Sequence, residues 1–133
     1  MKKIILDTNF LVSAARFKVD IFLELQRICD FKYATYIVDS TIDELEKLAE
    51  TGKPKDRVAA KISLDLVKRK KIKIIKTPIK NKRVKNVDFL ILNLIKKGKF
   101  IVATQDKALK RDIRKKGVPI IVLRQKKYFK LIV

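Results

Sequence analysis

The chain has 133 residues, 47% of them apolar, which fits one domain (residues 1–133) with a hydrophobic core and excludes a disordered basic tail. It has no histidine and one cysteine, which excludes imidazole catalysis, His-ligated metals, internal disulfides and four-cysteine zinc sites. The formal net charge of +20 is uneven, with 11 basic and 11 acidic side chains in residues 1–65 but 23 basic and three acidic ones in residues 66–133. This field favours a polyanionic partner, nucleic acid above all, although a merely soluble lysine-rich surface is the plain alternative.

The predicted elements alternate between short apolar runs and amphipathic stretches. Strands are predicted at residues 2–6, 33–38, 72–75, 100–103 and 119–123. Helices are predicted at residues 10–16, 19–30, 40–50, 55–70, 84–97 and 106–116. The basic and then apolar tail, residues 124–133, is predicted to be an edge strand or a docking segment.

Some helices carry a clear apolar face. In residues 55–70, Val58, Ile62 and Leu66 lie in register on one face of the helix. The helix at 84–97 has the most regular pattern and is expected to stop at Gly98. Cys29 lies near the apolar face of its helix and is read as a small buried thiol.

Alternating strands and helices predict an α/β fold, with a mainly parallel sheet of about five strands covered on both faces. The run before Asp7 is too short for a signal peptide, and no run is long enough to span a membrane. We therefore expect a soluble, cytoplasmic protein.

Acidic side chains follow the predicted strands where parallel folds bind ligands. Asp7 ends the first strand, Asp43 and Glu44 follow the second, Asp106 follows the fourth, and Asp88 opens the helix that leads into the fourth. Adjacent carboxylates repel one another, and a divalent cation relieves that conflict. Without histidine the ligands are oxygens, which suit Mg²⁺ or Mn²⁺.

Each acid also has an ordinary structural explanation. Asp7 and Asp106 precede helices as N-caps, Asp88 complements a helix dipole behind an Asn86 cap, and Ser40 with Asp43 resembles a capping box. Considered one at a time, each acid is better explained as a helix-capping residue than as part of a metal site. Taken together, the acids favour a site, because two of the three acids in residues 66–133 stand where a strand-end site needs them.

Polar side chains accompany two of the acids. Thr8 and Asn9 follow Asp7, and Thr104 precedes Asp106 by two residues. Hydroxyl and amide groups of this kind orient metal-bound water or fix carboxylate rotamers, although Thr8 and Asn9 are equally well explained as turn residues.

Four short segments, in this order and at these separations, resemble a PIN domain along essentially the whole chain. They are residues 4–11 (IILDTNFL), 40–48 (STIDELEKL), 87–92 (VDFLIL) and 101–111 (IVATQDKALKR). Residues 104–119 and 7–11 carry a closer resemblance to the branch with the PIN endonuclease of the small-subunit processome and its archaeal relatives, often grouped with VapC-type toxins. The resemblance implies a three-layer α/β/α sandwich and Mg²⁺- or Mn²⁺-dependent cleavage of RNA.

The resemblance also implies roles for particular residues. The acids of the family fall on Asp7, Glu44, Asp88 and Asp106. Many relatives carry another acid after the third one, where this chain has Phe89; Asp112 is a possible substitute or an ion-pair partner. We expect Asp7 and Asp106 to bind one cation, while Glu44 and Asp88 bind a second ion, a water or the ligands of the first. The expected chemistry is phosphodiester hydrolysis by metal-activated water.

Basic side chains are expected to hold RNA phosphates. Those nearest the site recur at helical spacing after Asp106: Lys107, Lys110, Arg111 and Arg114. Residues 68–71, 80–85 and 126–127 are expected to extend the track. Tyr128 and Phe129 either stack on bases or, as an apolar tail favours, are buried.

Two other classes of function remain open. One is a non-catalytic RNA-binding module in ribosome assembly, which the Phe89 departure favours and the retained acids disfavour. The other is a phosphoacceptor or phosphatase with Asp7 as nucleophile, which Asn9 and Lys2-Lys3 disfavour. As a nuclease, the chain is expected to act as a toxin with an antitoxin partner, or in rRNA processing on a pre-ribosomal particle; relatives suggest a homodimer.

Overall fold

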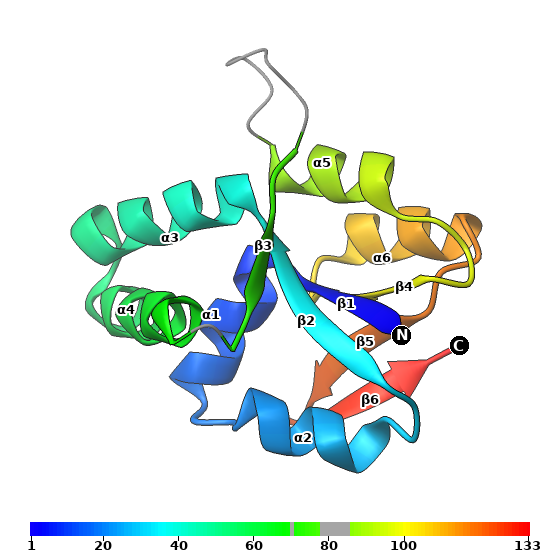
Figure 1. Cartoon of the computed structure of the whole chain (residues 1–133). Helices are drawn as coiled ribbons and strands as arrows, with labels where there is room; N and C mark the ends of the chain where they lie inside the picture. The colour runs from blue at the N-terminus through cyan, green and yellow to red at the C-terminus, as the bar shows by residue number, and fades with distance from the viewer. Residues whose placement is uncertain (70, 78–85) are drawn as a thin grey trace.

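In the computed structural model, which describes residues 1–69, 71–77 and 86–133, six strands form one sheet (Figure 1). The strands are β1 (Lys2–Leu6), β2 (Tyr33–Val38), β3 (Lys73–Ile75), β4 (Phe100–Ala103), β5 (Ile120–Arg124) and β6 (Tyr128–Ile132). Their order is β3-β2-β1-β4-β5-β6, and every neighbouring pair is parallel except β5 with β6. The predicted mainly parallel sheet is confirmed, and the tail forms its antiparallel edge strand.

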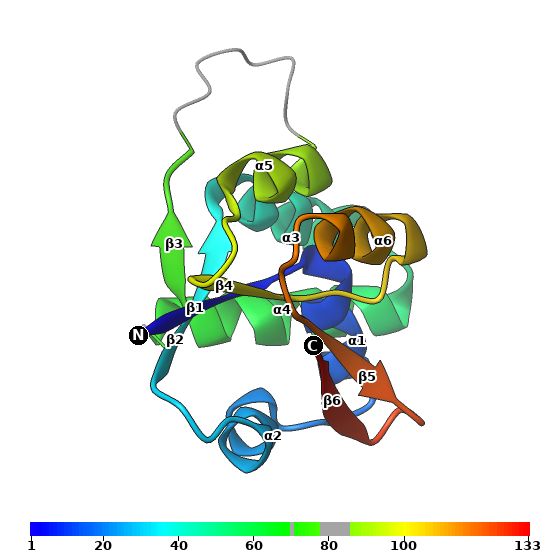
Figure 2. The ribbon, with the colours of Figure 1, turned by 90° about the vertical axis from the view of Figure 1, so that its right-hand side faces the viewer.

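Helices cover both faces of this sheet. They are α1 (Thr8–Arg16), α2 (Ile21–Ile28), α3 (Asp39–Thr51), α4 (Pro54–Lys68), α5 (Val87–Leu94) and α6 (Lys107–Lys115). Figure 2 shows α5 and α6 on one side of the sheet and α1 and α4 on the other. The expected three-layer α/β/α arrangement is therefore confirmed.

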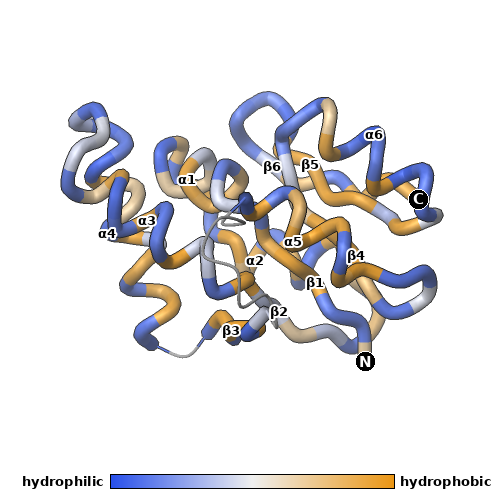
Figure 3. The backbone as a smooth tube through the Cα atoms, turned by 90° about the horizontal axis from the view of Figure 1, so that it is seen from above, coloured by the Kyte–Doolittle hydropathy of each residue, from blue (hydrophilic) through white to orange (hydrophobic). Residues whose placement is uncertain are grey.

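The central strands are apolar on both faces, because both faces are covered. On β1, Ile4 and Leu6 are fully buried in the core that α1 and α4 cover, whereas Ile5 is fully buried in the core beneath α5 and α6. The outer helices α3, α4 and α6 each combine hydrophilic and hydrophobic residues, as the blue and orange stretches of the tube show (Figure 3). This amphipathic pattern holds the helices against the sheet.

Strand β1 pairs with β2 on one side and with β4 on the other, all three parallel. The carboxyl ends of these strands therefore meet at one edge of the sheet. The chain leaves β1 toward β2 and later returns to β4 on the opposite side of β1. Parallel folds bind their ligands at the strand ends beside a reversal of this kind.

The face that Val58, Ile62 and Leu66 share on α4 is only partly buried. Val58 and Ile62 are 59% and 45% exposed, whereas Leu66 is partly buried against the core. The fully buried residues of the helix are Ala59, Ala60 and Ser63. Small side chains allow α4 to approach α1 and α3 closely, and the Ser63 hydroxyl is satisfied by donating to the Ala59 carbonyl at 2.9 Å. Close packing against α1 and α3 therefore decides which residues of α4 are buried, and the larger apolar side chains Val58 and Ile62 stay exposed.

Two other local predictions are corrected. Helix α5 ends at Leu94 and not at Lys97, because Ile95 leaves the helix in an extended conformation and is buried. Ser40 does not cap α3: Val38 is the N-cap, so Ser40 lies within the helix and forms no capping box with Asp43.

The Cys29 thiol is only partly buried, at the C-cap of α2. The expected basic residues at 70 and 80–85 lie outside the described residues. In the described part of the chain, no helix is both long and apolar enough to cross a membrane.

Candidate active site

Asp7 occupies the centre of the carboxyl edge of the sheet. Its backbone N–H donates to the Ala103 carbonyl at 2.9 Å, which extends the β1–β4 pairing by one residue. Its side chain is only 3% exposed and caps α1, with Oδ1 accepting from the Thr8 N–H at 2.9 Å. The capping explanation is thus correct for Asp7, yet the other carboxylate oxygen, Oδ2, points to a different partner.

That partner is Thr104, which follows β4 and is fully buried. Its hydroxyl donates to Asp7 Oδ2 at 2.8 Å and accepts from the Asp106 N–H at 3.1 Å. One hydroxyl therefore links the two acids that end neighbouring strands. These bonds orient the Asp7 carboxylate, and a supporting role of Thr104 in a reaction stays a prediction.

Asp106 caps α6 by accepting from the Leu109 N–H at 2.8 Å. Its Oδ1 makes this contact, so the capping explanation also holds here. Asp88, half-buried in the first turn of α5, follows an Asn86 cap as expected. A capping role and a position at the carboxyl edge therefore coexist in the same side chains.

Glu44 reaches the same edge from α3. Its Oε1 accepts from the Thr8 hydroxyl at 3.5 Å, at the limit of a hydrogen bond. The sequence left Asp43 and Glu44 as equal candidates, and the geometry favours Glu44. Asn9, Asp43 and Glu44 are all exposed, so the contact with Thr8 alone distinguishes Glu44 from Asp43. Asp112 lies 3.9 Å from Arg111 on α6.

The charges of the acids at this edge raise one another's pKa values. Burial raises the pKa of Asp7 from 3.8 to about 6, opposed by the hydrogen bonds from Thr104 and Thr8 and reinforced by the charges of Asp88 and Glu44. Loss of solvent and then the charge of Asp88 raise the pKa of Glu44. Loss of solvent and then the charge of Asp106 raise the pKa of Asp88.

The donor set fits a hard divalent cation, because it consists of carboxylate and hydroxyl oxygens. A cation would also offset the repulsion that raises these pKa values. In the described residues, however, no three acidic or cysteine side chains are gathered tightly enough to hold a metal ion as they stand. The acids share an edge of the sheet, and binding a cation through three of them would require their side chains to move closer together.

Sequence reasoning missed Gln105, which lies between Thr104 and Asp106. Its side-chain amide donates to the Leu123 carbonyl at 3.2 Å and accepts from the Leu123 N–H at 2.7 Å. These two bonds tie the loop after β4 to β5. The only signal in the sequence was its position between two candidate residues.

Four basic side chains predicted to hold RNA, Lys107, Lys110, Arg111 and Arg114, all lie on α6 beside the acidic edge and line one open groove. Arg124 on β5 lines the same groove and was also missed, because nothing in the sequence places it opposite α6.

Phe129 is buried and packs on Phe10 with ring centroids 4.8 Å apart, so it cannot stack on a base.

Comparison with known proteins agrees with this architecture. Over 132 residues the chain is 33% identical to Ribonuclease VapC4 of Methanocaldococcus jannaschii, covering 98% of the chain and 97% of the relative. It is 32% identical over 126 residues to the mouse rRNA-processing protein FCF1 homolog, covering 94% of the chain but 59% of that protein. This chain therefore spans less than two thirds of the FCF1 relatives.

A solved structure described as the PIN domain endonuclease Utp24 superposes with a TM-score of 0.78 at 27% identity, covering 97% of this chain and 90% of that one. A domain of a protein of unknown function from M. jannaschii shares the fold at 19% identity and a TM-score of 0.60. The family model for the PIN like domain matches residues 4–126. Since the match covers nearly the whole chain, the protein belongs to the PIN-like domain family.

Proposed function

We propose that this protein is a metal-dependent endoribonuclease that hydrolyses RNA phosphodiesters at the carboxyl ends of β1 and β4. The observation that carries the proposal is the buried Asp7 carboxylate, joined to Asp106 through Thr104 and surrounded by the charges of Glu44 and Asp88. Relatives named as a ribonuclease and a PIN domain endonuclease support it.

Asp7 and Asp106 are proposed to hold a Mg²⁺ or Mn²⁺ ion. Glu44 and Asp88 are proposed to bind a second ion, a water or the ligands of the first ion. A bound cation of this kind lowers the pKa of a water and stabilises charge on the leaving oxygen. Thr104 fixes the rotamer of Asp7 through Oδ2, and the Thr8 N–H fixes the other oxygen. Such outer contacts typically change metal affinity or activity about 10–100-fold.

The chain offers no histidine as a proton acceptor. Hydrolysis by an activated water leaves a 5′-phosphate and a 3′-hydroxyl, whereas attack by the 2′-hydroxyl leaves a 2′,3′-cyclic phosphate. Lys107, Lys110, Arg111 and Arg114 are proposed to hold phosphates near the scissile one, and phosphate contacts of this kind weaken as salt rises.

The test is cleavage of single-stranded RNA by wild type and Asp7→Asn, with Mn²⁺, with Mg²⁺ and with chelator, followed by analysis of the product ends. We expect cleavage only in wild type with metal, and 5′-phosphate ends. Asp43→Asn is the matched control, since it neutralises an exposed acid next to Glu44. Cleavage that survives the chelator, or cyclic phosphate ends, would contradict the mechanism.

A second candidate is a non-catalytic RNA-binding module. It is favoured by the absence of a tightly gathered acidic trio among the described residues and by Phe89, 48% exposed, beside Asp88. A module of this kind binds RNA equally well with and without Mn²⁺ and cleaves none.

The relatives suggest two biological settings. A VapC-type ribonuclease would be held by an antitoxin, whereas an rRNA-processing role would place the protein on a pre-ribosomal particle in the cytoplasm. Purification of the tagged protein from its own cells separates these settings, because the first yields one small protein partner and the second yields rRNA. A homodimer stays a prediction that the mass of the purified protein tests.

A further inference from the structure

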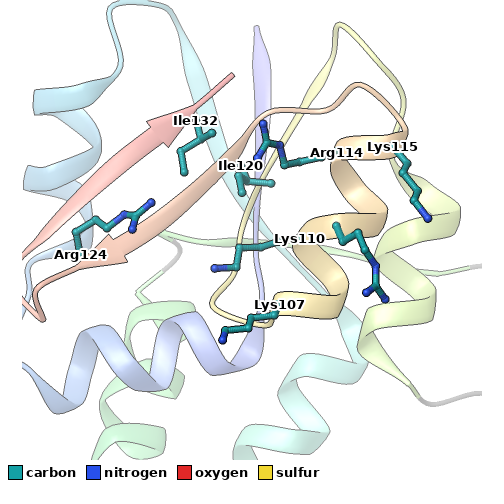
Figure 4. A pocket seen from close by; sticks show the side chains of 8 residues that line it. Lys107, Lys110, Arg114, Lys115, Ile120, Arg124 and Ile132 are labelled. Atoms are coloured by element: carbon teal, nitrogen blue, oxygen red, sulfur yellow. The ribbon is translucent and has the colours of Figure 1, made fainter.

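A groove of about 600 Å³ runs between α6 and the β5–β6 edge of the sheet (Figure 4). It is lined by six basic and two apolar side chains, namely Lys107, Lys110, Arg111, Arg114, Lys115, Arg124, Ile120 and Ile132. Among the residues that the structure describes, no acidic side chain lines it. The wall from α6 carries residues expected to bind RNA, but the wall from β5 adds Arg124, which belongs to none of the predicted basic clusters.

Within the described part of the chain, Lys107, Lys110, Arg114, Lys115 and Arg124 make no ion pair with an acid. Arg111 alone contacts one, Asp112 at 3.9 Å, and both of these side chains are solvent-exposed. Like charges gathered around a concave surface raise the local potential and attract anions. A ligand with several negative charges would relieve their mutual repulsion.

The two walls of the groove come from different elements, α6 and β5, and they face each other. Figure 4 shows Lys110 reaching from α6 and Arg124 reaching from β5 toward the space between them. Between the walls lie Ile120, which is 2% exposed, and the partly exposed Ile132. Charged walls with an apolar floor suit a ligand that alternates phosphates with flat apolar groups, as single-stranded nucleic acid does.

The groove is also connected to the acidic edge. Helix α6 begins at Lys107, directly after Asp106, and Gln105 bonds twice to Leu123, the neighbour of Arg124. The loop that carries Asp106 therefore lies at the start of both walls. A strand that follows α6 from the acidic edge therefore reaches the groove that α6 lines.

We propose that this groove binds the single-stranded segment of RNA next to the scissile phosphodiester, with Arg124 contacting a phosphate opposite Lys110 and Arg114. The identification of the ligand as substrate rests on the proposed nuclease function. A volume of about 600 Å³ is that of a site for one drug-sized ligand, so it holds a short strand and not a duplex. Domains that bind duplex RNA spread their contacts over roughly 16 base pairs.

The test measures binding apart from cleavage. All proteins carry Asp7→Asn, the probe is a fluorescent single-stranded RNA oligonucleotide without divalent metal, and anisotropy gives Kd over a range of salt concentrations. We compare Arg124→Ala, Arg124→Lys and Lys110→Ala with Lys61→Ala. Lys61 is an exposed lysine on α4, which packs on the opposite face of the sheet, so its loss changes net charge equally. Melting curves confirm that each variant is folded.

We expect Arg124→Ala and Lys110→Ala each to weaken binding several-fold relative to Lys61→Ala. Each should also reduce the slope of log K against log salt by about 0.7, the value for one phosphate contact to a single strand. Arg124→Lys should restore most of the slope, because a lysine keeps the charge.

Equal Kd values and slopes for Arg124→Ala and Lys61→Ala would overturn the proposal. So would a duplex of the same sequence that binds as tightly and is weakened as much by Arg124→Ala. The nuclease proposal is judged separately by cleavage in wild type. RNA binding that depends on Arg124 without cleavage refutes the nuclease alone, and cleavage without that dependence refutes the groove alone.

Discussion

Two clusters of like charge lie side by side in this protein, and they differ in burial. The acidic edge is built around Asp7, which is 3% exposed and fixed by hydrogen bonds through both carboxylate oxygens. The basic groove is open, and its principal cations, Lys107, Arg114 and Arg124, are exposed. Repulsion between buried charges shifts pKa values, whereas exposed charges are screened by solvent.

This difference indicates a division of labour. The buried Asp7 carboxylate is held in a fixed position by hydrogen bonds to both oxygens, as chemistry at a phosphodiester requires. Flexible exposed cations attract and hold a polyanion without fixing its reacting atoms. Substitutions in the acidic edge should therefore affect the rate of cleavage strongly, and substitutions in the groove should affect binding and its salt dependence.

The largest effect is expected for Asp7→Asn. Removing the charge at the centre of the edge should lower kcat more than about 100-fold, beyond the range for contacts that only orient ligands. Cleavage of single-stranded RNA in Mn²⁺ measures it. Kd for the same RNA without metal should change little, and a large change in Kd would break the division between chemistry and binding.

A smaller effect is expected for Thr104→Val, which removes the hydroxyl between Asp7 and Asp106. Cleavage should fall about 10–100-fold, and the pKa of Asp7 should rise further, because the bond from Thr104 lowers it. Thr35→Val is the matched control, since the buried Thr35 hydroxyl donates to the Lys71 carbonyl at 2.8 Å on another part of the sheet. Equal losses of activity in both variants would reduce Thr104 to a structural role.

The third prediction concerns stability without metal. Because the pKa of Asp7 is raised from 3.8 to about 6, the folded state binds this proton more tightly than the unfolded state. Its contribution to the free energy of unfolding therefore falls as pH rises from about 4 to 6 and stays low above that range. The cost at neutral pH is up to about 3 kcal/mol.

Urea unfolding of wild type and Asp7→Asn in chelator, at pH 4 and at pH 7, measures this cost. Asp7→Asn should gain stability relative to wild type as pH rises, while Asp43→Asn should follow wild type. Added Mn²⁺ should raise Tm of wild type and not of Asp7→Asn, since a ligand stabilises the state that binds it. Equal pH profiles would show that Asp7 is better solvated than its burial indicates.

The smallest effect is expected for Gln105→Met, which keeps the size of the side chain and removes both bonds to Leu123. Leu123 is 8% exposed, so its backbone groups lose partners in a poorly solvated place, and stability should fall by about 1–3 kcal/mol. Cleavage and RNA affinity should both fall a few-fold, because this loop starts the edge and the groove. If only cleavage or only RNA affinity fell, Gln105 would not connect the acidic edge with the groove.

Much of this fold could be predicted from local pattern. β2 and β4 have the predicted bounds, and the caps at Asp7, Asn86 and Asp106 were recognisable because capping depends on neighbours in sequence. The face of α4 could not be predicted, since a stripe of Val58 and Ile62 is more apolar than the alanines that are buried. What decides there is the close approach of other helices, which no single helix encodes.

The candidate site divides in the same way. Sequence alone determined that oxygen ligands and a cationic second half are the available chemistry, because composition excludes histidine sites and concentrates charge. Only the tertiary structure decided that Glu44 and not Asp43 meets Thr8, that Thr104 joins Asp7 to Asp106, and that Arg124 faces α6. These contacts connect residues far apart in the chain, and their geometry is set by strand order and helix packing rather than by local pattern.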